Sequence, residues 1–172
     1  IEMSVFGHCK ALASIEIPAS VETIVGNAFY GCTALASIEI PASVETIGNN
    51  AFPYCTALQT VTFEKGSQLK TIGDSTFSGC TSLTSIEIPA SVETIGRNVV
   101  NGCTSLKTVT FEKGSKLKMI QYNTFRDCTS LTTIEIPASV ETVEANAFNG
   151  CTSLKTVTFE KGSQLLMVDG YY

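Results

Sequence analysis

Apolar and polar side chains alternate in a short motif that recurs along the chain. In one copy, Ile38 and Ile40 alternate with Ser37 and Glu39. A period of two with β-branched residues predicts a short strand that turns one side inward. Because proline has no amide hydrogen for a strand ladder, we expect this strand to end at Pro41.

A second apolar edge follows each predicted strand. Val44 and Ile47 form it in the same copy, and Gly48 allows the chain to bend. Phe52 and Cys55 come next, and their spacing of three residues directs both side chains into one core. Five residues before each cysteine stands Asn or Ser, and both are preferred helix N-caps, so we expect a capped turn of helix or 3₁₀ structure there. This position holds Ser4, Asn27, Asn50, Ser75, Asn98, Asn123 and Asn146.

The cysteines mark a repeat of nearly constant length. They stand at Cys9, Cys32, Cys55, Cys80, Cys103, Cys128 and Cys151, with separations of 23, 23, 25, 23, 25 and 23 residues. The segment IEIPASVET begins at Ile15, Ile38, Ile86 and Ile134, and TVTFEKGS begins at Thr60, Thr108 and Thr156. The units with FEKGS are the longer ones, so the two extra residues lie in one loop.

Units of this size cannot bury their own apolar side, and neighbouring units must stack to share a core. Stacking places the strands in one parallel sheet at about 4.8 Å spacing. We therefore predict an α/β repeat architecture over residues 1–172. It is a single right-handed solenoid of about seven repeats, with a parallel sheet on a concave side and short helical or 3₁₀ turns on the other.

The chain starts and stops at the same phase of the repeat. Ile1 aligns with the column of Ile24, Ile47 and Ile72, and the sequence continues only four residues beyond Val168 in that column. The polar caps that a solenoid normally carries are missing. We expect a segment of a longer array whose ends expose core residues and a strand edge, which favours end-to-end self-association.

Composition excludes some partners. A hydrophobic content of 44% with 16% charged residues is typical of a folded chain rather than a disordered one. A net charge of −5 without a basic cluster argues against nucleic acid and anionic membranes as partners. No stretch approaches the roughly 18 apolar residues that a membrane span requires.

The pattern I-G-x-x-A-F-x-G-C-T-x-L-x-x-I-x-I-P-x-S-V resembles the BspA-like family, the Treponema pallidum type of leucine-rich repeat. It stands in Ile47–Val61 with the neighbouring Ile38–Val44, and again in Val143–Val157. The resemblance covers the whole chain and implies a leucine-rich-repeat solenoid in a surface or secreted protein, of a kind associated with adhesion to host matrix proteins or other cells. Local departures are Val99, Val100, Gln121 and Tyr122, and the residues that replace Gly before cysteine, His8, Tyr54 and Asp127.

The cysteines allow two interpretations. Seven cannot pair completely, and their spacing matches no zinc motif, but stacking would bring neighbouring Cα atoms to roughly 5 Å, within disulfide range. A disulfide or a metal therefore stays open. We favour buried free thiols, because each cysteine occupies the core column where common leucine-rich repeats have leucine.

The chain carries no recognisable catalytic motif. His8 is the single histidine and has no partner for a nucleophilic triad, so we interpret it as a surface loop variant. Sequences typical of dinucleotide, nucleotide-phosphate or zinc-protease sites do not occur. We expect a protein that is not an enzyme and needs no cofactor or metal.

Outward strand positions form the candidate binding face. We name it the sheet face, and its residues are Glu16, Glu39, Thr62, Glu87, Thr110, Glu135 and Thr158. A neighbouring stripe holds Ser14, Ser37, Thr60, Ser85, Thr108, Thr133 and Thr156. Solenoids commonly bind partners on such a surface, although the stripe could also be only the solvated side of a sheet. Glu16 and Glu39 are the one pair of stacked glutamates, which could hold a cation or be merely solvated.

A second column alternates in charge. It reads Glu22, Glu45, Lys70, Glu93, Lys118, Glu141 and Leu166. Exposed pairs of opposite charge contribute only a few tenths of a kcal/mol each, so we interpret the alternation as setting the register of the repeats.

The polar sheet face, together with what the family resemblance implies, predicts a non-catalytic, extracellular or cell-surface module that binds a protein ligand through the sheet face. A host matrix protein or a cell-surface protein would be the partner, and adhesion the role. The alternative is a structural spacer or stalk that projects another domain, because near-identical repeats suit that role equally well.

Overall fold

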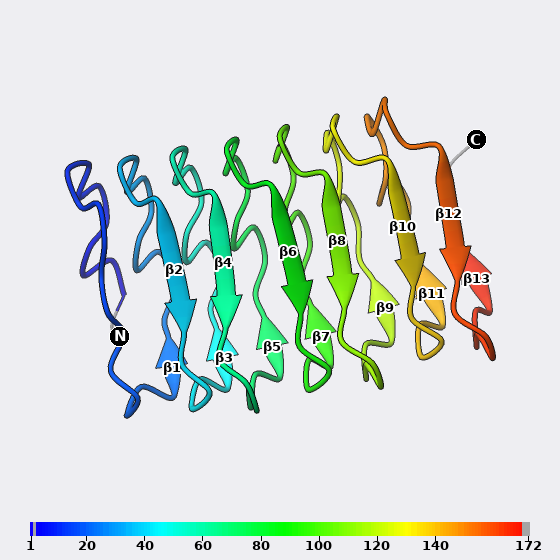
Figure 1. Cartoon of the computed structure of the whole chain (residues 1–172), viewed down its shortest axis with the longest axis horizontal. Coiled ribbons are helices and arrows are strands. Elements are labelled where there is room, and N and C mark those ends of the chain that lie inside the picture. The colour runs from blue at the N-terminus through cyan, green and yellow to red at the C-terminus, as the bar shows by residue number, and fades with distance from the viewer. Residues whose placement is uncertain (2, 170–172) are drawn as a thin grey trace.

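The computed structural model describes residue 1 and residues 3–169 as one stack of similar turns (Figure 1). Each turn after the first contributes one four-residue strand to one side. These strands are β2 (Ser37–Ile40), β4 (Thr60–Phe63), β6 (Ser85–Ile88), β8 (Thr108–Phe111), β10 (Thr133–Ile136) and β12 (Thr156–Phe159). All their described pairings are parallel, and each strand lies beside the equivalent strand of the next turn. This confirms the predicted leucine-rich-repeat solenoid with a parallel sheet.

The long strands alternate as the sequence predicts. In β2 the side chains of Ile38 and Ile40 are buried, whereas Ser37 and Glu39 are exposed. The strand ends immediately before Pro41, because proline supplies no amide for the ladder. Inward residues of successive strands pair in register and form one continuous core.

A second set of strands follows the apolar edge. They are β1 (Thr23–Ile24), β3 (Thr46–Ile47), β5 (Thr71–Ile72), β7 (Thr94–Ile95), β9 (Met119–Ile120), β11 (Thr142–Val143) and β13 (Met167–Val168). They form parallel ladders in the orders β1-β3-β5-β7 and β13-β11-β9. The sequence predicts the inward isoleucine of this edge but not the strand, because two residues are too short to show a period of two.

The expected helical turns are wrong, since the described residues contain no helix. The Asn or Ser assigned to a helix N-cap instead has a left-handed backbone, with φ of 59° at Asn27 and 54° at Ser75. Asparagine tolerates this region better than most residues because its short polar side chain bonds locally. The residue before each cysteine is left-handed too, with φ of 66° at Gly31, which explains the frequent glycine there.

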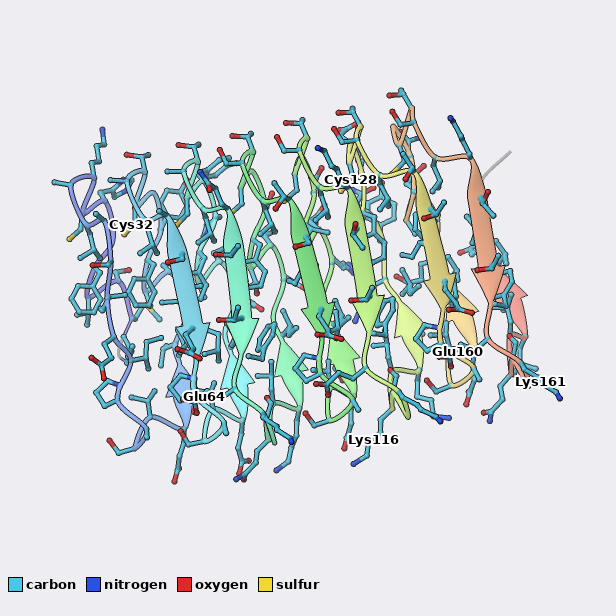
Figure 2. The ribbon with its side chains drawn as sticks, viewed as in Figure 1. Cys32, Glu64, Lys116, Cys128, Glu160 and Lys161 are labelled. Carbon is cyan, nitrogen blue, oxygen red and sulfur yellow. The ribbon has the colours of Figure 1, made fainter. Side chains whose placement is uncertain are left out.

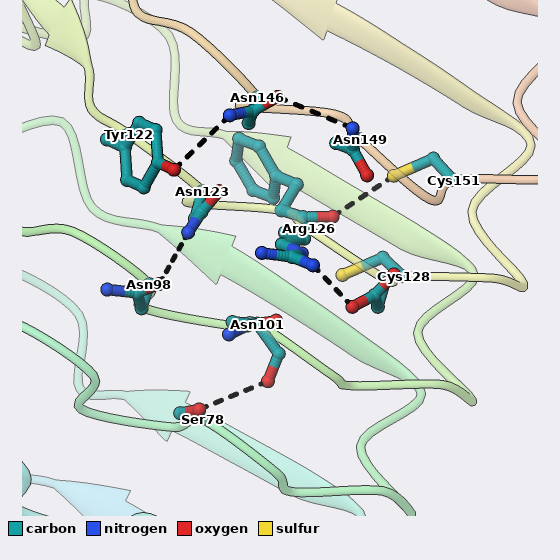
Figure 3. Close-up of polar contacts among 12 residues, drawn as sticks. Ser78, Asn98, Asn101, Tyr122, Asn123, Arg126, Cys128, Asn146, Asn149 and Cys151 are labelled. Carbon is teal, nitrogen blue, oxygen red and sulfur yellow. Dashed lines mark hydrogen bonds and ion pairs between the residues drawn. The ribbon is translucent and has the colours of Figure 1, made fainter.

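These turns bond to one another through their backbones. The amide of Phe29 donates to the carbonyl of Ala51 at 2.7 Å, and that of Phe52 donates to the carbonyl of Thr76 at 2.9 Å. Asparagine side chains continue the contact, since Asn123 Nδ2 donates to Asn98 Oδ1 at 3.1 Å (Figure 3). Each turn is therefore held to the next along this side as well as at both sets of strands.

Phenylalanine rings fill the core beneath the turns. Phe29 stacks on Phe52 with ring centroids 4.8 Å apart, and Phe52 stacks on Phe77 at 5.5 Å. Val99 and Val100 replace the Ala-Phe pair in the next repeat and are both 2% exposed. The core thus continues through the replacement although the ring stack is interrupted.

All seven cysteines are free thiols, and six of them are buried. Each buried thiol donates to a main-chain carbonyl of the preceding turn, as Cys55 does to Phe29 at 3.2 Å and Cys151 to Phe125 at 3.0 Å (Figure 3). Burial and the neighbouring Cys32 thiol raise the pKa of Cys55 from 9.0 to about 12. Buried free thiols are thereby confirmed for six positions. Cys9, in the first turn, is exposed, and its predicted burial is wrong.

We predict that thiol reagents discriminate Cys9 from the other cysteines. A neutral-pH labelling reaction on the folded protein should modify one thiol of seven, because the remaining six are buried and protonated. Mass spectrometry after labelling measures this, and labelling in denaturant provides the full count. Rapid modification of several thiols in the native protein would contradict the buried column.

Alkaline pH should destabilise the fold. The pKa of Cys55 is higher in the folded state than its ordinary value of 9.0, so the folded state retains a proton that the unfolded chain releases. Its contribution is complete below pH 9 and is lost as pH rises toward 12, with a slope of about 1.4 kcal/mol per pH unit. Denaturant titrations from pH 8 to 11 measure it. C55V should have a smaller slope than the parent protein, and an equal slope would contradict the assignment.

Candidate functional site

The seven residues of the sheet face are all exposed on the side formed by the long strands. Their register is direct, because Glu39 pairs with Thr62, Glu87 with Thr110 and Glu135 with Thr158. A threonine therefore separates successive glutamates, as the sequence predicts from Glu39 onward. Whether this surface binds a partner stays a prediction.

Hydrogen bonding between the long strands is not uniform. We name the 23-residue units IPASV repeats and the 25-residue units FEKGS repeats. Where an FEKGS repeat follows an IPASV repeat, all four residues pair, as in β2–β4, β6–β8 and β10–β12. Where an IPASV repeat follows an FEKGS repeat, the ladder shrinks to Thr60 opposite Ser85 between β4 and β6. The described ladders do not join β8 to β10, although these strands are neighbours.

Proline explains this difference. At the end of a fully paired junction the amide of Glu64 donates to the carbonyl of Ile40 at 3.0 Å. Glu112 and Glu160 donate in the same way to Ile88 and Ile136. In an IPASV repeat the equivalent residue is proline, which has no amide hydrogen to donate to the preceding strand. The strand ends can therefore separate at these junctions.

Three grooves open in the sheet face, each where an IPASV repeat follows another repeat. The first has a cavity volume of about 450 Å³ and is lined by Ser14, Ile15, Glu16, Ile17, Ala19, Ser37, Glu39, Pro41 and Glu64. The second measures about 260 Å³ and is lined by Thr60, Val61, Thr62, Phe63, Ser85, Ile86, Glu87, Pro89 and Glu112. The third measures about 220 Å³ and is lined by Thr108, Val109, Thr110, Phe111, Thr133, Ile134, Glu135 and Glu160. The sequence does not directly predict these grooves, because each forms between two turns and depends on which residue of one turn faces the proline of the next.

A glutamate at the end of each groove is fixed by a backbone bond. Glu64 accepts a hydrogen bond from the amide of Ala42 at 2.9 Å, and Glu160 accepts one from Ala138 at 2.9 Å. Both side chains lie where the long strands end (Figure 2). Glu112 accepts from Ala90 at the same distance. Sequence reasoning missed this role, although the regular succession of FEKGS after IPAS was a signal for it.

The alternating charge column forms two direct ion pairs. Lys70 Nζ lies 2.7 Å from Glu45 Oε2, and Lys118 Nζ lies 2.6 Å from Glu141 Oε1. The hydrogen bond and charge of Glu45 raise the pKa of Lys70. Each lysine thus bonds one glutamate of its two neighbours, in line with the predicted opposite-charge ladder. This column stands apart from the three grooves and lines none of them.

The described residues show no metal centre. No group of three or more His, Cys, Asp or Glu side chains within them is arranged to hold an ion. The cation considered for the pair Glu16 and Glu39 stays a prediction. His8 packs against Tyr30 with ring centroids 5.0 Å apart. No membrane-spanning helix is found in the part of the chain that the structure describes.

The stacked turns, the parallel sheet and the repeated core columns define a leucine-rich-repeat protein. A family described as BspA type leucine rich repeat region matches residues 1–116 and 118–167 in six copies. The chain therefore belongs to the BspA-type leucine-rich-repeat family, which confirms the resemblance found in its sequence.

Three solved bacterial proteins are similar in structure. The pneumococcal vaccine antigen PcpA is 36% identical with a TM-score of 0.68, over 75% of this chain and 31% of PcpA. A Treponema pallidum leucine-rich repeat protein is 28% identical with a TM-score of 0.70, over 90% of this chain and 71% of its own. A leucine-rich repeat protein from Eubacterium ventriosum is 24% identical with a TM-score of 0.70, over 85% of this chain and 44% of the Eubacterium chain. At this identity the similarity shows the fold alone.

The chain therefore spans only about a third of PcpA and less than half of the Eubacterium protein. A comparison with curated protein sequences found no match. These similarities establish the family and the fold.

We predict that restoring an amide at Pro89 closes part of the second groove. In P89A the new amide should donate to the carbonyl of Phe63, because Glu64 and Glu112 make the equivalent bond at the other junctions. Hydrogen exchange should show slow exchange at residue 89. P18A is the matched control, because no described strand lies beside Pro18 on that side. Fast exchange at both positions would contradict proline as the cause of the separation.

Proposed function

We propose that this chain is a non-catalytic module that binds a protein ligand at a cell surface through the sheet face. The carrying observation is an unpartnered parallel sheet whose exposed stripe of glutamate and threonine is interrupted by three similar grooves. Leucine-rich-repeat solenoids commonly bind proteins on such a surface. Similarity to a vaccine antigen supports an extracellular location, and a host matrix or cell-surface protein would be the ligand, with adhesion as the role.

Charge supports a protein partner rather than nucleic acid. The chain carries a net charge of −5, and the three grooves are lined by glutamate without lysine or arginine. Phosphate groups would be repelled from such a surface. A partner with complementary basic side chains would instead be attracted and oriented by it.

A spacer or stalk is the second candidate function. The three junctions from IPASV to FEKGS repeats have the same strand pairing and the same glutamate-to-alanine bond. Such uniformity suits a rod that only has to be long and stable. The sequences that flank this segment discriminate the two, because a distinct terminal domain beyond the array favours a spacer.

End-to-end self-association of this 172-residue segment would use the last described turn. Val157 and Phe159 of β12 are 39% and 43% exposed, and Leu166 is 83% exposed. Apolar strand edges of this kind pair readily with another chain. Light scattering across protein concentrations measures it, and a monomer at millimolar concentration would contradict end-to-end association.

Charge reversal on the sheet face should weaken ligand binding. We expect E87K combined with E135K to lower binding to immobilised host matrix proteins at least ten-fold, because both side chains are exposed on the stripe and form no hydrogen bond or ion pair with the described residues. E22K combined with E93K changes the same charge away from the sheet face and is the matched control. Binding that survives E87K/E135K would rule out the sheet face as the site.

A further inference from the structure

We infer that the three grooves bind the cationic side chains of one basic polypeptide that runs along the solenoid axis, across the strands. This inference rests on the proposed protein-binding function and specifies the chemistry and conformation of the ligand. Its basis is the lining of the grooves, their regular spacing and the way in which their carboxylates are fixed.

Each groove presents carboxylates without a compensating basic residue. Glu87 and Glu112 line the second groove, and Glu135 and Glu160 line the third. The first is lined by three glutamates, Glu16, Glu39 and Glu64. The lysines of the chain lie outside all three linings. A guanidinium or ammonium group is therefore the complementary ligand, and guanidinium bonds carboxylates with two parallel hydrogen bonds.

One carboxylate of each groove is already oriented. Glu112 accepts the amide hydrogen of Ala90 through Oε2 at 2.9 Å, which leaves the other oxygen without a described partner. Glu87 stands on the exposed side of β6 in the same groove. The hydroxyls of Thr62 and Ser85 line the wall and can accept further donors from a guanidinium group. The site is thus partly organised before a ligand arrives, which lowers the entropic cost of binding.

The grooves recur once every two turns. They lie at the junctions before β2, β6 and β10, and the closed pairs β2–β4, β6–β8 and β10–β12 fill the intervals between them. Two strand spacings amount to about 10 Å. A ligand that fills all three grooves therefore needs cations at intervals of about 10 Å along one edge.

A polyproline II segment meets this requirement. It has three residues per turn and advances about 3.1 Å per residue, so every third side chain lies on one edge at intervals of about 9.3 Å. An extended strand repeats a side-chain direction every second residue, at about 6.8 Å, and cannot match. The favoured ligand is a polyproline II segment with arginine or lysine at every third position.

Three grooves on one rigid array also explain how weak contacts would add up. A single exposed ion pair contributes little to affinity. After the first cation binds, the second and third bind at a high effective concentration because the peptide holds them near their grooves. Binding should therefore rise steeply with the number of correctly spaced cations and fall with added salt.

Synthetic peptides test the spacing. The probe is a fluorescent ten-residue peptide with arginine at every third position and proline at the others, measured by fluorescence anisotropy at 20 mM and 150 mM salt. We expect it to bind at least ten-fold more tightly than a peptide of the same composition with its arginines adjacent. Equal affinities would overturn the inference, because they would indicate unspecific attraction to an acidic protein. Tighter binding of a helical peptide with arginine at every seventh residue would overturn the polyproline II conformation.

Neutral variants test the location. E87Q combined with E135Q should weaken binding of the spaced peptide at least ten-fold, whereas E22Q combined with E93Q, which removes the same charge elsewhere, should leave it unchanged. Equal loss in both pairs would overturn the groove assignment. If no arginine peptide binds, but E87K/E135K still lowers binding to a matrix protein, this inference is wrong and the proposed protein-binding function stands. Thermal unfolding of each variant verifies that its fold is intact.

Discussion

The constraint on which this structure depends is that a single turn cannot bury its own apolar side. Each turn must therefore bond and pack against its neighbours along its whole length. Backbone hydrogen bonds do this at the long strands, the short strands and the left-handed turns. Phenylalanine rings, cysteine thiols and isoleucine side chains then stack in columns between these ladders. A column position is consequently defined by the residue above and below it, more than by its neighbours in sequence.

This dependence on neighbouring turns explains why the two repeat types alternate. The glutamate amide of an FEKGS repeat donates to the strand end of the preceding IPASV repeat, as Glu64 does to Ile40, and its carboxylate accepts the amide hydrogen of Ala42. At the opposite junctions proline has no amide hydrogen to donate, and the strand ends separate. The same difference marks the grooves, since Pro41 and Pro89 both line one. The features of the sheet face that could serve recognition thus follow from the ordinary chemistry of a missing amide hydrogen.

Much of the fold could be predicted from the sequence, because alternation and repetition act locally. The inward Ile38, the strand end at Pro41 and the buried Cys55 follow from period, amide chemistry and column position. The prediction of a helical turn was wrong because asparagine is favoured both as a helix N-cap and in the left-handed region of the backbone. Sequence alone does not separate these two conformations. The grooves were not predictable at all in this way, because they arise between turns.

The glutamate-to-alanine bond also restricts how such an array can change in length. Gain or loss of two consecutive turns leaves every junction type intact, whereas gain or loss of one turn can place two FEKGS repeats side by side. The second glutamate would then face a preceding FEKGS loop instead of the alanine amide that Glu64 finds at Ala42. Two IPASV repeats in succession are compatible, as Ser43 shows by donating to the carbonyl of Val21 at 2.8 Å. Duplication or deletion by pairs of turns, about 48 residues at a time, therefore preserves packing, whereas a change that brings two FEKGS repeats together does not.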